Sequence, residues 1–129
     1  MHDANAAAIG VDMDQLMIRA AQGLRQHLQP ITGHVWILCG PGNNGGDGFR
    51  LAMMLDDCSV IVSHQKQKTS LSKRARNDCN RVMYNSDSMP NQEPTIIVDC
   101  LLGAGCKGEL RTEIATILQK LPPHVPILS

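Results

Sequence analysis

Aromatic residues, an excess of charge of either sign and long apolar runs are all nearly missing from this chain. Its 129 residues include one Trp, one Phe and one Tyr, and its 12 basic and 12 acidic side chains cancel. Nucleic-acid-binding proteins usually carry a basic excess or aromatic rings on which bases stack, so this class is disfavoured. No apolar run approaches the ~20 residues of a membrane-spanning helix, and the first ten residues do not resemble a secretory signal.

Cysteine is present, but without a recognisable framework. The five cysteines are odd in number and form no CxxC pair. This pattern argues against a disulfide scaffold and against a zinc ribbon, and it favours a reducing compartment, which we take to be the cytoplasm. Cys39 and Cys100 lie near the ends of apolar runs, where a small buried side chain is the simplest interpretation.

Apolar and amphipathic segments alternate along the chain and predict an α/β fold. The periodicity predicts helices over residues 12–29, capped by Asp14, and over 48–56, 72–83 and 113–121, and strands over 34–39, 59–64 and 95–103, with a fourth strand opening at 125–128. Strands that alternate with helices imply a mostly parallel sheet with helices on both faces. The length fits one domain, residues 1–129. Because Ser129 follows the start of the fourth strand directly, we expect a domain truncated there, without its C-terminal portion.

The stretch GPGNNGGDG, residues 40–48, stands between a predicted strand and a predicted helix. A GxGxxG pattern in that context indicates a dinucleotide site. The acidic residue that usually holds the ribose about 20 positions later is missing, because the next strand reads VIVSHQK. This weakens the prediction of an NAD-dependent dehydrogenase, and binding of a 2′-phosphate by His64 or Lys66 is one alternative among several. A phosphate-binding P-loop is excluded because the stretch contains no lysine.

Three polar side chains in this stretch suit a polar ligand. Asp47 would repel a bare phosphate at the start of a helix, so we interpret it either as a helix cap or as an acceptor for hydroxyl or amide groups of a ligand. Asn43 and Asn44 offer amide oxygens to a hard cation or to ligand groups, although each can also be an ordinary turn residue. We interpret the glycines as positions where a nucleotide approaches the backbone closely.

Asp99 interrupts the apolar run IIVDCLLG. A charge inside a buried strand needs a partner, hydrogen bonds or a metal ion. Because Asp99 lies near the carboxyl end of its strand, it can face Asn44 across neighbouring strands and form an oxygen-only cation site. A purely structural carboxylate is the alternative. The following turn, GAGCKGEL, is either a phosphate cradle with Lys107 as a point charge or a simple turn.

Residues 66–81 carry six basic side chains and one acid, Asp78. Such a stretch can contact phosphate or RNA, but it is more often a solvated helix face.

Three segments together resemble one known family. They are MDQLMIRAAQGL near the start, GPGNNGGDGF, and IIVDCLLGAG some fifty residues later. They are similar to the YjeF N-terminal domain family, the NAD(P)H-hydrate (NAD(P)HX) epimerases, from about residue 3 to the end. The resemblance implies a Rossmann-like three-layer α/β/α fold and an isomerase that interconverts the R and S forms of hydrated NADH and NADPH, as part of nicotinamide nucleotide repair. It also implies a potassium ion and functional coupling to an ATP- or ADP-dependent NAD(P)HX dehydratase.

The resemblance also implies a set of site residues. The substrate would be lined by Asn43, Asn44, Gly45, Gly46 and Asp47, and its phosphates held by Gly103, Ala104, Gly105, Cys106, Lys107, Gly108 and Glu109. Potassium would bind Asn44 and Asp99. Because inversion at the hydrated carbon needs proton movement, the catalytic carboxylates are expected to be Asp47 and Asp99. The family's D-x-P-S-G motif would fall beyond Ser129, and GAGCKGEL stands where the family more often has GTGLxRPL.

Other functions remain open from the sequence. The same fold can serve as a non-catalytic nucleotide- or protein-binding scaffold, as relatives do in RNA processing. An NADP-binding dehydrogenase is a weaker alternative. We expect a small-molecule substrate, no membrane and no nucleic acid as partner, and we leave a homodimer open.

Overall fold

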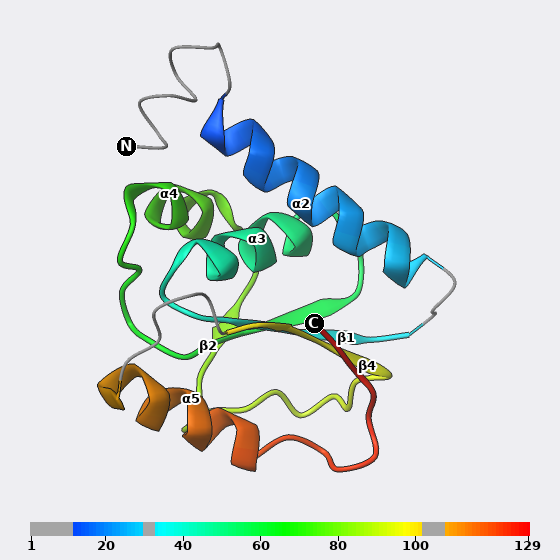
Figure 1. The fold of residues 1–129 in the computed structure, drawn as a ribbon. Coiled ribbons are helices and arrows are strands. Elements are labelled where there is room, and N and C mark those ends of the chain that lie inside the picture. The colour runs from blue at the N-terminus through cyan, green and yellow to red at the C-terminus, as the bar shows by residue number, and fades with distance from the viewer. Residues whose placement is uncertain (1–11, 30–32, 102–107) are drawn as a thin grey trace.

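A computed structural model describes residues 12–29, 33–101 and 108–129 (Figure 1). Its elements are α2 (Met13–Leu28), β1 (Val35–Cys39), α3 (Asn43–Ala52), β2 (Cys58–Val62), α4 (Ser70–Asp78), β3 (Met83–Tyr84), β4 (Ile96–Cys100), α5 (Gly108–Gln119) and β5 (Ile127–Leu128). None of the described helices has the length and apolar character needed to cross a membrane.

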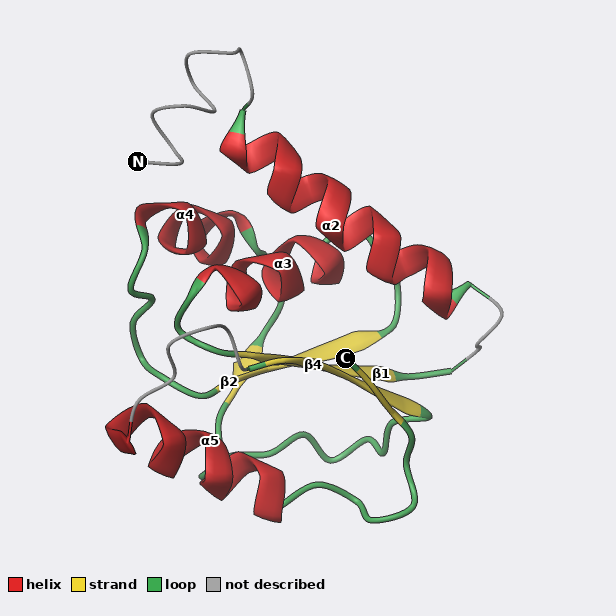
Figure 2. Ribbon diagram, viewed as in Figure 1, coloured by secondary structure: helices red, strands yellow, loops and turns green. Residues whose placement is uncertain are grey.

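The strands form one sheet in the order β3-β2-β1-β4-β5, and every pairing among them is parallel. Helices α2, α3 and α4 lie on one face and α5 lies on the other (Figure 2). The predicted parallel sheet in a three-layer α/β/α arrangement is thereby confirmed. All five residues of the central strand β1 are buried, as expected for a strand that is covered on both faces.

Alternate side chains of the central strands build two separate cores. Val35, Ile37 and Cys39 of β1 point toward the three-helix face, where they join buried residues such as Phe49 of α3. Trp36 and Leu38 point the other way and pack with Ile114 and Ile117 of α5. The indole N–H of Trp36 donates to the carbonyl of Gln92 at 2.9 Å, which fixes the loop that runs beneath the sheet toward β4.

The order of the strands creates a crossover beside β1. From β1 the chain proceeds outward to β2 and β3, and it then returns to place β4 on the opposite side of β1. After β1 the chain enters α3 on one face, and after β4 it enters α5 on the other face (Figure 1). In open α/β sheets, ligands bind in the crevice outside the carboxyl ends of two such strands.

The helix α3 starts at Asn43 and ends at Ala52, whereas we predicted residues 48–56. Its glycines have low helix propensity, which led us to expect a loop, but packing overrides propensity here. A Cβ at Gly45 would lie 1.9 Å from the Gly40 carbonyl oxygen, and one at Gly48 would lie 2.6 Å from the sulfur of Cys39. These two glycines therefore allow α3 to pack closely on the end of β1. The approach of a nucleotide to the backbone of this loop stays a prediction.

Several other boundaries also differ from our predictions. Asp12, not Asp14, caps α2, because its Oδ1 accepts the N–H of Asp14 at 3.0 Å. Thr69 accepts the N–H of Ser72 and so starts α4 two residues early, and the helix ends at Asp78 rather than at residue 83. Met83, the last residue of the predicted helix, instead begins β3, a two-residue strand paired with β2. The helix α5 begins at Gly108, five residues before the expected start.

Arg50 joins the three helices that cover one face. This side chain of α3 is buried, and its two terminal nitrogens reach Asp14 of α2 at 2.8 Å and Asp78 of α4 at 2.9 Å. The Asp14 side chain is itself only 17% exposed, so it depends on this cation for its charge balance. A guanidinium group suits the position because one planar group can serve two carboxylates at once.

We expect Arg50→Met to lower the free energy of unfolding by about 2–3 kcal/mol, because it leaves two carboxylates without their buried cation. Urea denaturation followed by circular dichroism measures the effect. Arg19→Met, which removes an exposed arginine from α2, is the matched control and should change stability by less than about 0.5 kcal/mol. Equal effects of the two substitutions would contradict the role of Arg50.

The glycine packing gives a second prediction. Gly45→Ala should lower the free energy of unfolding by at least about 3 kcal/mol, because the added methyl group meets a backbone carbonyl that no rotamer change can move. Gly42→Ala is the matched control: no atom lies within 4 Å of the added Cβ, so we expect a change within about 1 kcal/mol. Thermal unfolding of the two variants separates the effects. A Gly45→Ala variant as stable as the parent would contradict the packing account.

Candidate functional site

The candidate site lies where α3 begins, above the carboxyl ends of β1 and β4. Gly48 of α3 faces this edge, since a Cβ there would lie 3.2 Å from the Cβ of Cys100. Asn44 is four residues before Gly48 and three residues before Asp47. Positions three to four apart share a helix face. Both side chains are half-buried. The structure thus brings Asn44 and Asp47 to the same side of α3, near the end of β4.

Burial changes the acidity of two groups at this edge. Desolvation raises the pKa of Asp47 from 3.8 to about 6. Burial, together with the nearby carboxylates of Asp47 and Asp99, raises the pKa of the Cys100 thiol to about 12. The cysteine is therefore an inert thiol, and its surroundings show that both predicted catalytic carboxylates lie close to one strand end.

Asp99 approaches the same edge from the other face of the sheet. It lies level with Leu38 of β1, whose side chain belongs to the core beneath α5. Its Oδ1 accepts the backbone N–H of Leu101 at 3.0 Å, which holds the carboxylate at the strand end. The predicted neighbouring placement of the two strands is confirmed, and the binding of a cation between Asn44 and Asp99 stays a prediction.

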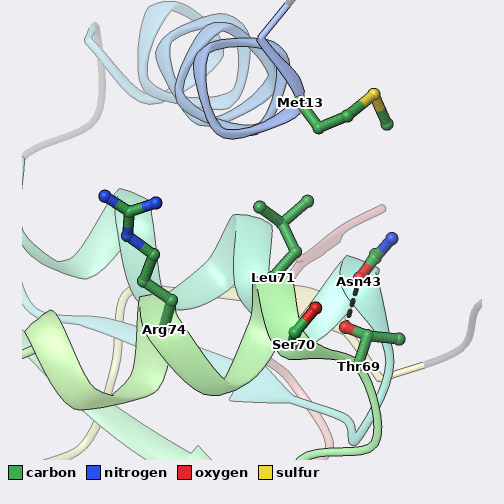
Figure 3. Close-up of a pocket in the computed structure, with 6 residues that line it drawn as sticks. All are labelled: Met13, Asn43, Thr69, Ser70, Leu71 and Arg74. Atoms are coloured by element: carbon green, nitrogen blue, oxygen red, sulfur yellow. Dashed lines mark hydrogen bonds between the residues drawn. The ribbon is translucent and has the colours of Figure 1, made fainter. Parts of the chain in front are cut away.

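Asn43 serves a different surface from Asn44. Its side-chain oxygen accepts a hydrogen bond from the Thr69 hydroxyl at 2.5 Å. Figure 3 shows this pair beside a hollow of about 340 Å³ that is also bordered by Leu71 and Arg74 of α4 and by Met13 of α2. This hollow lies among the helices, away from Asp47 and Asp99. The structure therefore separates the two asparagines that the sequence places side by side.

The turn between β1 and α3 is held by residues that the sequence analysis did not select. The buried Gln67 donates from Nε2 to the Gly40 carbonyl at 2.7 Å. The N–H of Lys68 and the hydroxyl of Ser72 reach the Pro41 carbonyl at 2.8 and 3.4 Å. The only sequence signal for these contacts is that residues 63–70 contain no apolar side chain.

The basic stretch at residues 66–81 is not one solvated face. Arg76 donates to the carbonyl of His64 at 2.8 Å and to Oε1 of Gln67 at 3.0 Å, and it lies 5.9 Å from the ring centre of Phe49. Burial lowers its pKa. Arg81 donates to backbone carbonyls at the end of α3 and just after it. Two of the six basic residues are therefore structural.

The second glycine-rich turn falls largely outside the described residues. This applies to Gly103, Ala104, Gly105, Cys106 and Lys107, whereas Gly108 and Glu109 begin α5. The start of α5 lies at the carboxyl edge of the sheet (Figure 1). The backbone N–H groups of a first helical turn have no intrahelical partners and favour anions.

No group of three or more His, Cys, Asp or Glu side chains that could hold a metal ion occurs in the described residues. An Asn–Asp site with backbone carbonyls has a different donor set, of hard oxygens only. The four described cysteines, Cys39, Cys58, Cys79 and Cys100, are free thiols.

A second polar cluster lies at the opposite, amino edge of the sheet. The buried His34 contacts Asp57 through Nδ1 at 2.6 Å and the Ser59 hydroxyl through Nε2 at 2.8 Å. The three side chains contact one another in the order Asp57, His34, Ser59, which is the order of the Asp–His–Ser triad of hydrolases. Ser59, however, is only 7% exposed and sits within β2, so we interpret the cluster as a link between the starts of two strands.

Comparison with known proteins agrees with this geometry. The family model described as YjeF-related protein N-terminus matches residues 13–129. The chain is 34% identical over 120 residues to the NAD(P)H-hydrate epimerase of Legionella pneumophila strain Philadelphia 1, a match that covers 78% of this chain and 43% of that protein.

Two bifunctional proteins are also similar. Identity to the bifunctional NAD(P)H-hydrate repair enzyme Nnr of Thermanaerovibrio acidaminovorans is 33% over 125 residues, covering 87% of this chain and 24% of that protein. Identity to the enzyme of the same name from Escherichia coli K12 is 27% over 136 residues, covering 96% and 26%. The chain therefore spans about a quarter of these relatives. Since the family model covers nearly all of the described residues, the chain belongs to the family of YjeF-related protein N-terminal domains.

Proposed function

We propose that this chain is an NAD(P)H-hydrate epimerase domain, which interconverts the R and S forms of hydrated NADH and NADPH. The observation that carries the proposal is the approach of Asp47 and Asp99, from opposite faces of the sheet, to the end of β4 at the crossover. Two carboxylates near the place where α/β folds bind nucleotides suit a reaction that needs proton movement and no redox step.

The raised pKa of Asp47 gives this residue a chemical role. With a pKa of about 6, a useful fraction of the carboxyl stays protonated near neutral pH. Inversion proceeds if the carbon–oxygen bond of the hydrated carbon breaks and re-forms. Protonated Asp47 gives its proton to the departing hydroxyl, which leaves as water with the electron pair of the bond, and the adjacent ring nitrogen shares its lone pair with the carbon. Water then adds to the other face of the carbon and returns a proton to the carboxylate, so that the enzyme is unchanged.

The loop at the start of α3 and residues 103–109 bind different parts of the nucleotide. Asp47 would repel a phosphate at the start of α3, so the phosphates belong at residues 103–109, next to the start of α5. Asn44, with its amide beside Asp47, then contacts the hydrated nicotinamide ring. Gly45 and Gly46 line this end of the site, and only the Gly45 N–H is left for the substrate, because the N–H of Gly46 donates to the Gly42 carbonyl at 3.3 Å.

We propose potassium as the bound cation, held by Asn44 and Asp99. The donor set fits, because the amide and carboxylate oxygens at this edge are hard ligands. The positive charge of the ion would offset the charge of Asp99, and the ion would orient oxygen atoms of the substrate. Asp99 remains fixed for this role by its hydrogen bond to the N–H of Leu101.

The proposed partners follow from the substrate. The S form would pass to an ATP- or ADP-dependent NAD(P)HX dehydratase, and the names of the bifunctional relatives are compatible with a second activity on the same polypeptide. A cytoplasmic location and a homodimer stay predictions. The free thiols of the described residues are compatible with the former.

The activity itself can be measured by mixing the chain with R-NADPHX in potassium buffer and following the S form by chromatography. We expect acceleration over a protein-free sample, less acceleration in sodium buffer, and a loss of at least about 100-fold in kcat/KM for Asp47→Asn and Asp99→Asn. Asp56→Asn, at an exposed aspartate, is the control and should retain activity. A folded parent chain that gives no acceleration would overturn the proposal and favour a non-catalytic binding module.

The same carboxylate should cost the domain stability. Folded Asp47 holds its proton up to a pH of about 6, while the unfolded chain loses it near 3.8, so stability falls as the pH rises between these values. Asp47→Asn should therefore unfold at a higher temperature at pH 7. The variant should gain about 1 kcal/mol in the free energy of unfolding, since the half-buried carboxyl is partly screened by solvent. At pH 3 the gain should vanish. Scanning calorimetry at both pH values tests this, and an equal gain at pH 3 would contradict it.

A further inference from the structure

A hollow at the carboxyl end of β2 has no role in the reaction described above. Its volume of about 310 Å³ falls at the lower end of the range for small-molecule sites, ~300–1000 Å³. The hollow is bordered by Ser63 and His64 after β2, by Asn85 and Asp87 after β3, and by Glu113 of α5. It therefore opens at the carboxyl edge of the sheet, near the start of α5.

The side chain of His64 lies beside Glu113. Its Nδ1 lies 2.6 Å from the Ser63 hydroxyl, and its Nε2 lies 3.3 Å from Oε2 of Glu113. The imidazole is 13% exposed, and Nε2 is buried without a hydrogen bond among the described residues. Its backbone is also fixed, because Arg76 donates to the His64 carbonyl. The carboxylate of Glu113 is 53% exposed, so it lies beside His64 at the end of β2 with room to bind a ligand.

This place has a general function in dinucleotide-binding folds. An acidic residue about 20 positions after the glycine-rich turn, at the end of the second strand, accepts hydrogen bonds from the adenosine ribose. That position here holds Ser63 and His64, and no acid is present in the local sequence. The structure supplies the carboxylate from α5 instead, because His64 contacts Glu113.

The charges around the hollow favour hydroxyl groups over a phosphate. Glu113 and Asp87 are carboxylates with exposed positions. The only cations among the lining residues are Arg76 and, if protonated, His64. Arg76 is already engaged with the His64 carbonyl and with Gln67, and the buried nitrogen of His64 faces Glu113. A 2′-phosphate would meet two negative charges, whereas ribose hydroxyls would find acceptors.

We propose that this hollow binds the adenosine ribose of the dinucleotide, with Glu113 accepting hydrogen bonds from its hydroxyls. The site therefore favours the hydrate of NADH over that of NADPH. The proposal rests on the proposed epimerase function, since it assigns the other end of the same substrate. It replaces the alternative that His64 binds a 2′-phosphate.

Isothermal titration calorimetry with ADP-ribose and ADP-ribose 2′-phosphate tests the hollow without the nicotinamide ring. The parent chain should bind ADP-ribose about tenfold more tightly than the 2′-phosphate, since a hydrogen bond to a charged group is involved and each 1.4 kcal/mol is a factor of ten. Glu113→Gln should reduce this ratio to about threefold or less, and Glu113→Lys should reverse it. Glu93→Gln, at an exposed glutamate on the loop before β4, is the control and should keep the parent ratio.

The outcomes separate this proposal from the proposed function. A preference for the 2′-phosphate, equal binding of the two probes, or a ratio that Glu113→Gln leaves unchanged would overturn the ribose site, even if the chain accelerates epimerisation. Failure to bind either probe would overturn it as well. If epimerisation is then also absent, the proposed function fails with it. Thermal unfolding of each variant confirms that a lost preference does not come from a lost fold.

Discussion

The close contact between α3 and the end of β1 determines the rest of this edge of the molecule. Gly45 approaches the Gly40 carbonyl so closely that no larger residue fits, and Gly48 lies directly on Cys39 and Cys100. Because only three residues separate the end of β1 from the start of α3, the first turn of α3 lies over the crossover between β1 and β4. A longer or looser connection would move Asn44 and Asp47 away from Asp99. The geometry of the proposed active site therefore depends on backbone packing.

A turn rich in glycine cannot hold itself with its own side chains. Its stability comes instead from the segment that connects β2 to α4, where Gln67, Thr69 and Ser72 bond to the turn or to Asn43. Arg76 in turn holds Gln67 and the backbone of His64, and so links this support to the hollow at the end of β2. The support of the turn and the proposed ribose site thus share one hydrogen-bonded network.

The sequence predicted those features that depend on local pattern. The alternation of the longer helices and strands, the parallel sheet and the position of the first glycine-rich turn directly after a strand are confirmed. The start of α3 was missed because the glycines oppose a helix locally and are needed only for contact with the sheet. Two-residue β3 gives no periodicity to detect. The placement of Glu113 against His64 was also invisible, since these residues are 49 positions apart and only the fold brings them together.

The same packing also explains how an ordinary aspartate acquires a raised pKa. Gly45 and Gly48 let α3 pack closely on the ends of β1 and β4, and the helix carries Asp47 into a half-buried position near Cys100. No ion pair or hydrogen bond to Asp47 occurs within the described residues to offset this loss of solvent, so its carboxyl retains a proton to a pH of about 6. In the proposed function, a glycine pattern shared with dehydrogenases thus serves a different chemistry. The glycines set the depth of the helix, and the polar residues between them determine which reaction the site can support.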